Sequence, residues 1–322
     1  MNSDNPLPTA QTTTPNFGQA LFDLRKQFNQ TVEPHHSDLW RYCLHLTGSV
    51  WDAEDLLQDT LLKAFARLST IFQPLEMKPY LFRIASNTWI DQMRRTKLQL
   101  DAMPDDLPAE TSGTDSIAVK AAIERLVQVL PPRQRVACLL VDVFDFSLAE
   151  AAQFLQISPG ATKSLLHHAR ASLQSHNHIE VAYQPKVELR ETPDDDIVKR
   201  YIEAFNRHDL DTLLELLHPA ATSDILGVFV EEGRETMRQG SLKAWADDKR
   251  PQWVNYGELE GQPTFFVFIR NSDGVEGLAW LIGIKIVETQ IVIIQDYYFC
   301  ADLVRFVAQA MGVPALPNPP FS

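Results

Sequence analysis

The segment Ser147–Leu173 has the residue types and spacing of a helix-turn-helix that binds DNA. Ser147 and Glu150 form an S-x-x-E capping box at the start of a short helix. Ser158 and Pro159 then supply an N-cap and a first-turn proline for a second helix. One side of this second helix is apolar, and the other side carries Lys163, Ser164, His167, His168 and Arg170. Such a helix can dock by its apolar side and read a major groove with the other. The alternative is an ordinary helical hairpin with a solvated polar face.

A second set of basic residues lies in the expected helix Tyr80–Arg95. The face opposite its apolar side carries three guanidinium groups and one amide, from Arg83, Asn87, Arg94 and Arg95. These groups suit a phosphate backbone and nearby base edges. Aromatic residues in or near this stretch, namely Phe72, Tyr80, Phe82 and Trp89, can stack on unpaired bases or belong to a core. We expect Trp89 and Phe65 to be core residues.

The expected helix Asp52–Phe65 has two distinct faces. Leucines, Ala64 and Phe65 form an apolar face. Another face, at i, i+3, i+4 and i+7 spacing, consists of Asp55, Gln58, Asp59 and Leu62. The apolar face is expected to point into a core, which leaves this mainly acidic face directed away from it.

Together these segments resemble regions 2 and 4 of the extracytoplasmic-function sigma factors of the sigma-70 family. The resemblance rests on the runs DAEDLLQD, RIASNTWIDQMRR, LPPRQR and SPGATKSLLHHAR in this order and at this spacing, and it covers roughly residues 15–175. It implies that the face with Asp55, Gln58, Asp59 and Leu62 binds core RNA polymerase. It also implies that the helix with Arg83 reads the minus-10 promoter element and that the helix with Lys163 reads the minus-35 element. The implied protein is a cytoplasmic transcription initiation factor and not an enzyme, with core RNA polymerase and promoter DNA as partners.

The second helix of the helix-turn-helix departs from this family pattern. Leu165 and His168 stand where the family usually has basic residues. Lys163 and Arg170 are its remaining full charges, since His167 and His168 are mostly neutral at physiological pH. Each missing cation removes a phosphate contact, so minus-35 binding is expected to be weak or its target unusual.

Charge is distributed unevenly along the chain. The formal net charge of the 322 residues is −13. Residues 179–322 contribute most of it, and the two helical segments are close to neutral. A free DNA-binding domain is usually basic. A sigma-type protein needs less positive charge, because the polymerase supplies much of the affinity for DNA.

Composition excludes several other classes of protein. An apolar fraction of 45% fits globular domains, and no apolar run is long enough to span a membrane. The three cysteines, Cys43, Cys138 and Cys300, lie in apolar segments and are expected to be buried, reduced thiols. Four histidines occur close together at His167, His168, His176 and His178, but no cysteine or carboxylate completes a metal motif. No metal site and no cofactor is therefore expected.

The last third of the chain has a different pattern. An amphipathic helix pair, Ile197–Leu217, precedes expected strands at 263–270, 277–287 and 290–299 and a helix at 301–311. Helices followed by antiparallel strands predict an α+β domain, and residues 288–289 are a hairpin turn in length. The run AFNRHDLDTLLELLHP resembles the start of the SnoaL-like (nuclear transport factor 2-like) cone fold, over roughly residues 195–312. This resemblance implies a domain that regulates the sigma part within the same chain.

SnoaL-like cones often enclose a pocket, and some are enzymes. The candidates for lining it are Asp224, Trp245, Phe266, Arg270, Trp280 and Asp296, with His218 as a further polar candidate. The alternative is that they are core aromatics and solvated carboxylates, so no catalytic residue is assigned. Such extensions typically carry an Asp-Gly-Gly-Gly-Lys loop. Here its nearest counterpart is the run DILGV at residues 224–228, which puts the role of that loop in doubt.

The predicted protein is therefore multidomain, with two all-α domains and an α+β cone. Its expected parts are a disordered tail (1–16), a region-2 domain (17–97), an acidic linker (98–115), a region-4 helix-turn-helix domain (116–175), a linker (176–195), a SnoaL-like domain (196–313) and a tail (314–322). The alternatives are a degenerate sigma homologue that reads promoters weakly, and a small-molecule sensor or enzyme fused to sigma-like domains.

The acidic cone is expected to dock on the DNA-facing cations, Arg83, Arg94, Arg95, Lys163 and Arg170, with additional apolar contact.

Overall fold

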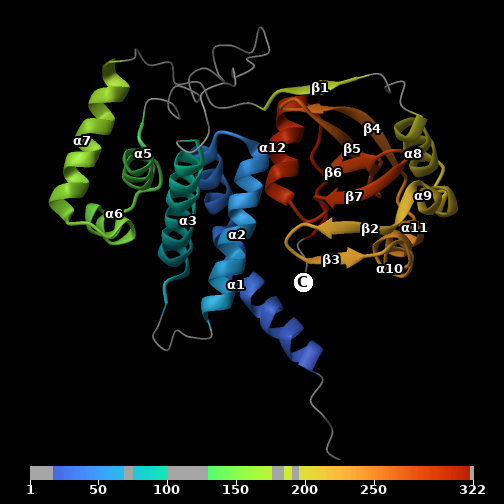
Figure 1. Ribbon diagram of the computed structural model, residues 1–322, viewed down its shortest axis with the longest axis horizontal. Helices are drawn as coiled ribbons and strands as arrows, with labels where there is room; N and C mark the ends of the chain where they lie inside the picture. The colour runs from blue at the N-terminus through green and yellow to red at the C-terminus, as the bar shows by residue number, and fades with distance from the viewer. Residues whose placement is uncertain (1–16, 69–74, 101–129, 176–184, 191–195, 320–322) are drawn as a thin grey trace, which may run out of the picture.

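The computed structural model describes residues 17–68, 75–100, 130–175, 185–190 and 196–319. Figure 1 shows a helical half beside a sheet half. The helical half consists of α1 (Phe17–Thr47), α2 (Val50–Leu68), α3 (Met77–Leu100), α5 (Pro132–Cys138), the π-helical turn η1 (Leu139–Val143), α6 (Leu148–Leu155) and α7 (Pro159–Ser175). The expected tail at residues 1–16 and most of the expected linker at 98–115 lie outside the described residues.

Three helices, α1 to α3, pack around one apolar core. The predicted helices at 52–65 and 80–95 form the central parts of α2 and α3. Trp89 is buried, as expected, and so are Tyr80 and Phe82, which therefore cannot stack on bases in this arrangement. Phe65 is half-buried and packs on Phe28, with ring centroids 5.3 Å apart. Phe72 lies outside the described residues.

The long helix α1 is an element that the sequence pattern does not reveal. Pro34 lies in its middle. Proline lacks an amide hydrogen and usually ends or kinks a helix. The sequence therefore does not predict that the apolar residues before and after Pro34 belong to one helix. Phe28 and Val32 before it and Leu39 after it are nevertheless buried against α2 and α3. Tertiary packing therefore maintains a helix of 31 residues.

The helix-turn-helix forms as predicted and lies against the first three helices. The Ser147 hydroxyl accepts a hydrogen bond from the backbone of Glu150, whose carboxylate accepts one from the backbone of Ser147, which completes the capping box. Phe144 packs against the rings of Tyr42 (5.2 Å) and Phe82 (5.3 Å). An aromatic cluster therefore fixes the second helical domain on the first.

The sheet half contains β1 (Val187–Leu189), α8 (Asp196–Asn206), α9 (Leu210–Leu216), β2 (Leu217–Ile225), β3 (Phe229–Glu232), α10 (Arg234–Gln239), α11 (Ser241–Asp247), β4 (Gln252–Leu259), β5 (Gln262–Arg270), β6 (Glu276–Val287), β7 (Gln290–Asp296) and α12 (Ala301–Met311). The strand order is β1-β4-β5-β6-β7-β2-β3, and within it β2 and β7 are parallel. The predicted helix pair, the last three strands, the 288–289 hairpin and the final helix are confirmed, although β7 ends at Asp296.

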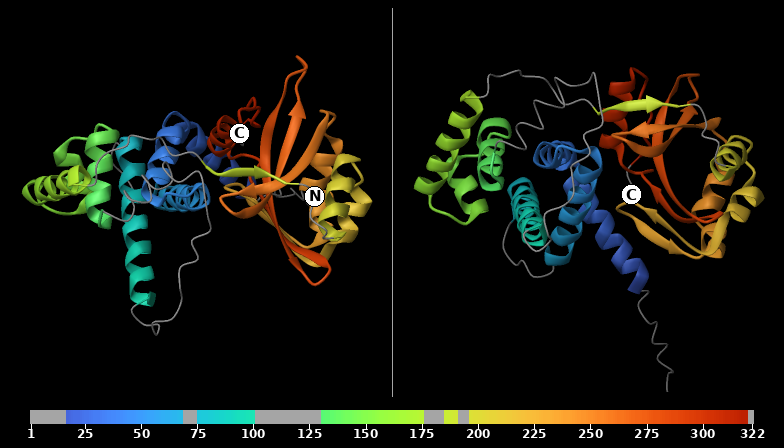
Figure 2. Two further views of the ribbon diagram at one scale, coloured as in Figure 1. Left: turned by 90° about the horizontal axis from the view of Figure 1, so that it is seen from above. Right: turned by 45° about the horizontal axis from the view of Figure 1, so that its top comes forward.

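The two faces of this sheet have separate cores. Alternate side chains of β5 and β6, such as Phe265 and Trp280, pack against α8 and α9 on the inner face. Their neighbours Phe266 and Leu281 belong to the core of the outer face, together with α12. Figure 2 shows the sheet curving around α8 and α9 on one side, with α12 on the side of the helical half. The sheet half is the α+β domain that the sequence predicts.

The outer face of the sheet half and the helices α1 and α2 share one continuous apolar core. The Trp40 ring contacts Phe306 of α12 at 5.2 Å, and the Trp51 ring contacts Tyr297 at 5.1 Å. The Trp51 indole nitrogen also donates a hydrogen bond to the carbonyl oxygen of Leu259 (3.1 Å). The C-terminal domain is therefore docked on the first helical domain.

Two expected boundaries are wrong in part. Within the expected linker at 176–195, Val187–Leu189 form β1, an edge strand paired with β4. Within the expected tail at 314–322, backbone bonds join Pro314 and Leu316 to Leu278 of β6. Both segments are short and lack alternation, so only their sheet partners reveal their structure.

The shared core predicts a cost for a cavity at Leu303, which is fully buried on α12. Leu303→Ala removes apolar contacts on both sides of the interface and should lower the free energy of unfolding by about 2–5 kcal/mol. Leu189→Ala is the matched control, since Leu189 is 53% exposed. Urea denaturation measures both variants. Equal small losses would mean that α12 does not belong to a shared core.

Candidate nucleic-acid and protein interfaces

The outward face of α7 carries the residues that the sequence assigns to DNA. Lys163, Ser164, His167, His168 and Arg170 are all exposed, while Leu166 and Ala169 are buried on the opposite side. Leu165 is half-buried and packs against the core, so an arginine at that position could not serve simply as a phosphate ligand. The face has the geometry of a groove-reading helix with few charges.

Arg170 is already paired in this structure. Its guanidinium binds both carboxylate oxygens of Asp142 on η1, at 2.5 Å (Nη2 to Oδ1) and 3.2 Å (Nε to Oδ2). A bidentate pair of this kind is stronger than a single contact. Among the lysine and arginine residues on the described outward face of α7, Lys163 is therefore the one without a carboxylate partner.

A groove between α2 and α3 brings together most of the second predicted set. Arg83, Asn87 and Arg95 line a groove of about 270 Å³. Two cations that the pattern on α3 alone could not reveal, Lys63 and Arg67 of α2, line it as well. Lys63 is held by hydrogen bonding to Thr88 (3.2 Å) and faces Asp59 at 3.8 Å. Arg94 is not among the lining residues and pairs with Asp91 at 3.2 Å.

The acidic face of α2 is largely accessible. Asp55 is exposed, Leu62 is 61% exposed, and Asp59 is half-buried. Partial burial and the neighbouring carboxylates Asp52 and Glu54 raise the pKa of Asp55. Gln58, in contrast, is half-buried and donates a hydrogen bond to Glu54 at 2.7 Å. Three of the four predicted residues are thus presented together, and the fourth points into the domain interface.

Glu54 is a buried carboxylate at the centre of that interface, with 1% exposure. It accepts hydrogen bonds from the Trp40 indole (3.0 Å) and the Gln58 amide (2.7 Å). The Cys300 thiol, at the start of α12, bonds to the same carboxyl group, and burial raises the pKa of that thiol far above its ordinary value. Donors from both halves of the protein therefore satisfy one buried acid.

The docked face is not the one expected from charge. The C-terminal domain lies on α1 and α2, whereas α7 lies at the opposite end of the molecule (Figure 1). Arg83 contacts the Tyr80 ring, Arg94 pairs with Asp91, and Arg170 pairs with Asp142. The expectation that the acidic domain covers these cations is wrong, because burial of apolar surface outweighs attraction between solvated charges.

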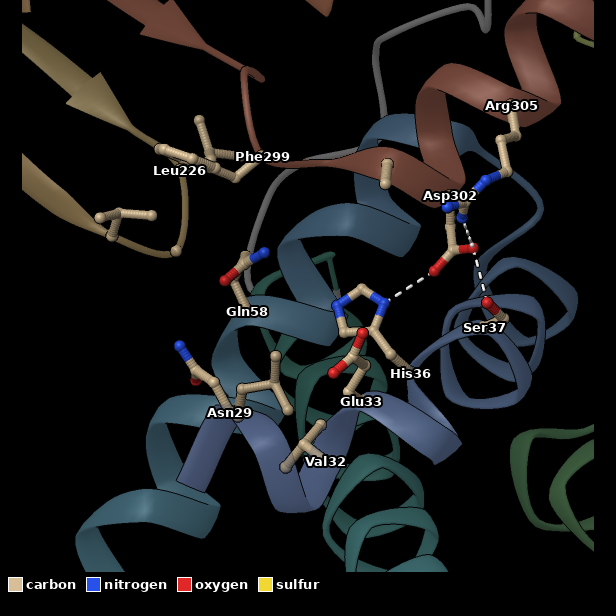
Figure 3. Close-up of a pocket in the computed structure, with 14 residues that line it drawn as sticks. Asn29, Val32, Glu33, His36, Ser37, Gln58, Leu226, Phe299, Asp302 and Arg305 are labelled. Carbon is tan, nitrogen blue, oxygen red and sulfur yellow. Dashed lines mark hydrogen bonds and ion pairs between the residues drawn. The ribbon is translucent and has the colours of Figure 1, made fainter. Parts of the chain in front are cut away.

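A cavity of about 300 Å³ lies between α1, α2, the β2–β3 turn and α12. Figure 3 shows Asp302 of α12 directed at two residues of α1. Its carboxylate binds the His36 ring nitrogen Nδ1 (2.7 Å) and the Ser37 hydroxyl (2.7 Å). Arg305 also donates to Asp302 at 3.0 Å, and Glu33 lines the cavity beside them.

The His36–Asp302 pair favours the protonated imidazole. Burial alone lowers the pKa of His36, but the hydrogen bond and charge of Asp302, with a further contribution from Glu54, outweigh burial and the opposing charge of Arg305. The pKa of His36 is therefore raised above its ordinary 6.5. The same pair lowers the pKa of Asp302 despite its burial.

The structure separates the predicted pocket residues of the C-terminal domain. Trp280 and Trp245 both contact Phe205 on the inner face, and Asp296 lies on that face because it pairs in register with the inward-facing Ile282. The other candidates lie elsewhere: Phe266 is in the outer core, Arg270 is exposed and paired with Glu276, Asp224 is half-buried toward Asp55, and His218 is exposed.

The inner face retains unpaired polar atoms. Burial raises the pKa of Asp296 to about 7, and its Oδ1 has no hydrogen-bond partner among the described residues. The Trp245 indole nitrogen and Gln252 Oε1 are also buried and unpaired within the described part of the chain. None of the described pockets covers these three residues together.

Cys43, Cys138 and Cys300 are buried free thiols, in agreement with the sequence. Across the described ranges, no group of three histidine, cysteine or acidic side chains is placed to hold a metal ion, and His176 and His178 fall outside those ranges. None of the described helices combines the length and apolarity needed to cross a bilayer.

Two family models match the helical half. Sigma-70 region 2 matches residues 31–99, and sigma-70 region 4 matches residues 120–173. The ECF RNA polymerase sigma factor SigM of Mycobacterium tuberculosis is 31% identical over 149 residues, which cover 46% of this chain and 76% of SigM. The chain belongs to the extracytoplasmic-function sigma factors.

A second relative extends further along the sigma factor. The ECF RNA polymerase sigma factor SigG of Mycobacterium tuberculosis is 32% identical over 232 residues. The alignment covers 62% of each of the two proteins, so this sigma factor matches somewhat less than two thirds of SigG.

Solved structures resemble the sigma factor more distantly. The Mycobacterium tuberculosis sigma factor SigJ shares 20% identity, with coverage of 87% of this chain and 95% of SigJ and a TM-score of 0.30. Bartonella quintana RpoE, solved in complex with the anti-sigma factor NepR, shares 27% identity over 47% of this chain and 96% of RpoE, with a TM-score of 0.38. Both TM-scores are below 0.5, so the family assignment rests on the sequence relatives.

The Asp142–Arg170 pair predicts that region 4 of this sigma factor gains DNA affinity when the acid is neutralised. Asp142→Asn releases Arg170 and removes a negative charge, which should raise nonspecific DNA affinity a few-fold at low salt and steepen its salt dependence. Asp145→Asn is the control, since Asp145 is an exposed acid of the same domain. Fluorescence anisotropy with labelled duplex DNA measures both variants. Equal gains would indicate a general charge effect.

The His36–Asp302 pair predicts a pH-dependent stability. Because the pKa of His36 is raised in the folded protein, the pair stabilises it fully below about pH 6.5 and loses this effect as the pH rises through the raised pKa. His36→Gln should therefore cost about 1–2 kcal/mol near pH 5.5 and less near pH 8.5, measured by urea denaturation. His35→Gln is the control, since His35 does not line the cavity. A cost for His36→Gln that is independent of pH would contradict the pairing.

Proposed function

We propose that this sigma factor binds core RNA polymerase through α2 and directs it to promoter DNA through the α2–α3 groove and α7. The observation that carries the proposal is the exposed face of α2 with Asp55, Asp59 and Leu62. It belongs to the same helix that contributes Lys63 and Arg67 to the basic groove. One helix thus links a protein-binding face to a nucleic-acid-binding groove.

The groove suits a DNA strand. Lys63, Arg67, Arg83 and Arg95 supply four cations around the Asn87 amide, although Asp59 and Asp91 offset part of this charge. Guanidinium and ammonium groups bind phosphates, and an amide can read a base edge. We assign minus-10 recognition to this groove and minus-35 recognition to the outward face of α7.

A variant of this proposal is a sigma factor that reads the minus-35 element weakly. It is supported by the pairing of Arg170 with Asp142 and by a histidine, His168, where the family usually has a basic residue. With Lys163 as the principal free cation, promoter selection would then depend mostly on the α2–α3 groove and on the polymerase.

We further propose that the C-terminal domain regulates the sigma part within the chain, by docking and not by catalysis, and that the protein acts in the cytoplasm with the polymerase. Support comes from the shared core and the buried Glu54.

A different candidate role, binding of a small molecule on the inner face of the sheet, is favoured by the unpaired atoms of Asp296, Trp245 and Gln252. In that role the C-terminal domain would be a sensor, and binding of the small molecule would change how the domain acts on the sigma part.

The proposal predicts that charge on α2 decides polymerase binding. Asp55→Arg combined with Asp59→Arg reverses both acids of the exposed face and should abolish co-purification of the full-length chain with core RNA polymerase. Loss of interfacial charge complementarity typically costs several kcal/mol. Run-off transcription from candidate promoters should be lost in parallel.

The matched control reverses two exposed acids of the C-terminal domain, Glu203→Arg with Asp211→Arg, which gives the same change in net charge. This control should co-purify with core polymerase like the unaltered chain. Undiminished co-purification of the Asp55/Asp59 variant would remove the main support for the proposed function.

A further inference from the structure

The inner face of the sheet carries three buried polar atoms without partners among the described residues. Gln252, at the start of β4, is 7% exposed, and its Oε1 is one of them. The others are Nε1 of Trp245 on α11 and Oδ1 of Asp296 at the end of β7. Gln252 lies two residues before the inward-facing Val254, so its side chain shares this face. An unpaired buried polar atom costs free energy, so three on one face indicate a binding site.

Two of these atoms belong to side chains that contact the same imidazole ring. The amide nitrogen of Gln252 lies 3.2 Å from His208 Nε2. The Trp245 ring stacks on His208, with centroids 4.5 Å apart and an interplanar angle of 18°. Because His208 occupies the amide nitrogen, the carbonyl oxygen of Gln252 is left as an acceptor. The Trp245 indole N–H is a donor. One donor and one acceptor are therefore presented beside each other.

Aromatic rings connect this donor–acceptor pair to Asp296. Phe205 contacts Trp245 at 5.0 Å and Trp280 at 6.4 Å between ring centroids. Trp280 in turn contacts Tyr298 at 5.1 Å. The carboxyl group of Asp296 accepts a hydrogen bond from the backbone of Tyr298. A continuous aromatic wall thus runs along the inner face, and such a wall favours a flat, apolar ligand body.

The charges on this face favour an uncharged ligand. Arg250 donates to the Tyr298 hydroxyl at 3.2 Å, but its guanidinium also binds both carboxylate oxygens of Asp248 and the side chain of Asn318. This cation is therefore already committed to protein groups. Burial raises the pKa of Asp296 to about 7, so this acid is readily protonated near neutral pH. A neutral ligand then leaves no buried charge uncompensated.

The helix that supplies Trp245 is loosely packed. None of the seven residues of α11 is fully buried, and Trp245 itself is half-buried. Segments with few buried contacts open at a low cost in free energy. Outward movement of α11 therefore gives a small molecule access to the inner face while the sheet stays folded.

We infer that the inner face binds an uncharged aromatic lactam, a flat ring that carries an amide edge. Trp245 donates to the carbonyl oxygen of the lactam, and the lactam N–H donates to Gln252 Oε1. The aromatic wall contacts the ring, and the carboxylic acid of Asp296 donates to a second acceptor on it. This inference rests on the proposed small-molecule role of the C-terminal domain and adds the chemical class of the ligand.

The test titrates the full-length chain with carbostyril, a flat bicyclic lactam, in isothermal titration calorimetry. N-methylcarbostyril is the matched probe, since it keeps the ring and the carbonyl group but lacks the N–H. Carbostyril should bind about ten-fold more tightly than the N-methyl probe, because only carbostyril can satisfy the buried acceptor of Gln252.

Two substitutions test the two hydrogen bonds separately. Gln252→Met removes the acceptor and should weaken carbostyril binding about ten-fold while leaving the N-methyl probe unaffected. Gln262→Met is its matched control, since Gln262 begins β5 and is exposed. Trp245→Phe removes the donor and should weaken both probes. Trp253→Phe, which alters a ring on the outer face, should weaken neither. Circular dichroism and thermal unfolding establish which variants are folded.

The outcomes separate this inference from the role on which it rests. Preference for carbostyril, lost in folded Gln252→Met and kept in both controls, supports the lactam site. If both probes bind equally and the folded variants bind like the unaltered chain, the lactam site is overturned while a small-molecule role stands. Absence of binding by both probes up to millimolar concentration overturns both, and ordered water is then the partner of the three atoms. Polymerase binding is tested independently by the variants of α2.

Discussion

Burial of the Glu54 carboxylate is the constraint on which the arrangement of this protein depends. An acid with 1% exposure requires hydrogen-bond donors, since each unsatisfied buried group costs free energy. The donors are Trp40 of α1, Gln58 of α2 and Cys300 before α12. These elements must assemble together, so the acid ties the C-terminal domain to the first helical domain and fixes the orientation of Gln58.

Burial of apolar surface stabilises the docked state. Polar groups around this apolar surface make the stability of the docked state depend on pH. Trp40 and Trp51 pack on aromatic rings of the C-terminal domain, and this apolar burial involves no titratable group. Around it lie the His36–Asp302 pair, a cavity and the facing carboxylates of Asp55 and Asp224. An interface with a strong apolar centre and a titratable rim can hold one arrangement firmly and still respond to conditions. The overall net charge of −13 plays little part, because the solvated cations of α3 and α7 are not covered.

The proposed function of this protein depends on which helix faces stay accessible to partners after the domains have packed together. The helix α2 contributes to three surfaces at once: its acidic face, the groove with α3 and the contact with the β2–β3 turn. All three proposed functional surfaces therefore depend on the placement of one helix. Region 4 lies on the opposite side and is joined through Phe144 and its aromatic partners. The two proposed DNA-reading surfaces thus belong to one packed body with the C-terminal domain.

The sequence by itself determined the local elements and their chemical character. The Ser147–Glu150 capping box, the hairpin at residues 288–289 and the polar face of α7 follow from patterns a few residues long, which depend on backbone hydrogen bonds and side-chain periodicity. Only the tertiary structure decided which other element each helix or strand face packs against. The span of α1 across Pro34, the edge strand β1, the pairing of Arg170 with Asp142 and the placement of the C-terminal domain on α2 all involve residues distant in sequence. Charge predicted the wrong docking site because the free energy of apolar burial depends on shape and area, which a linear pattern does not contain.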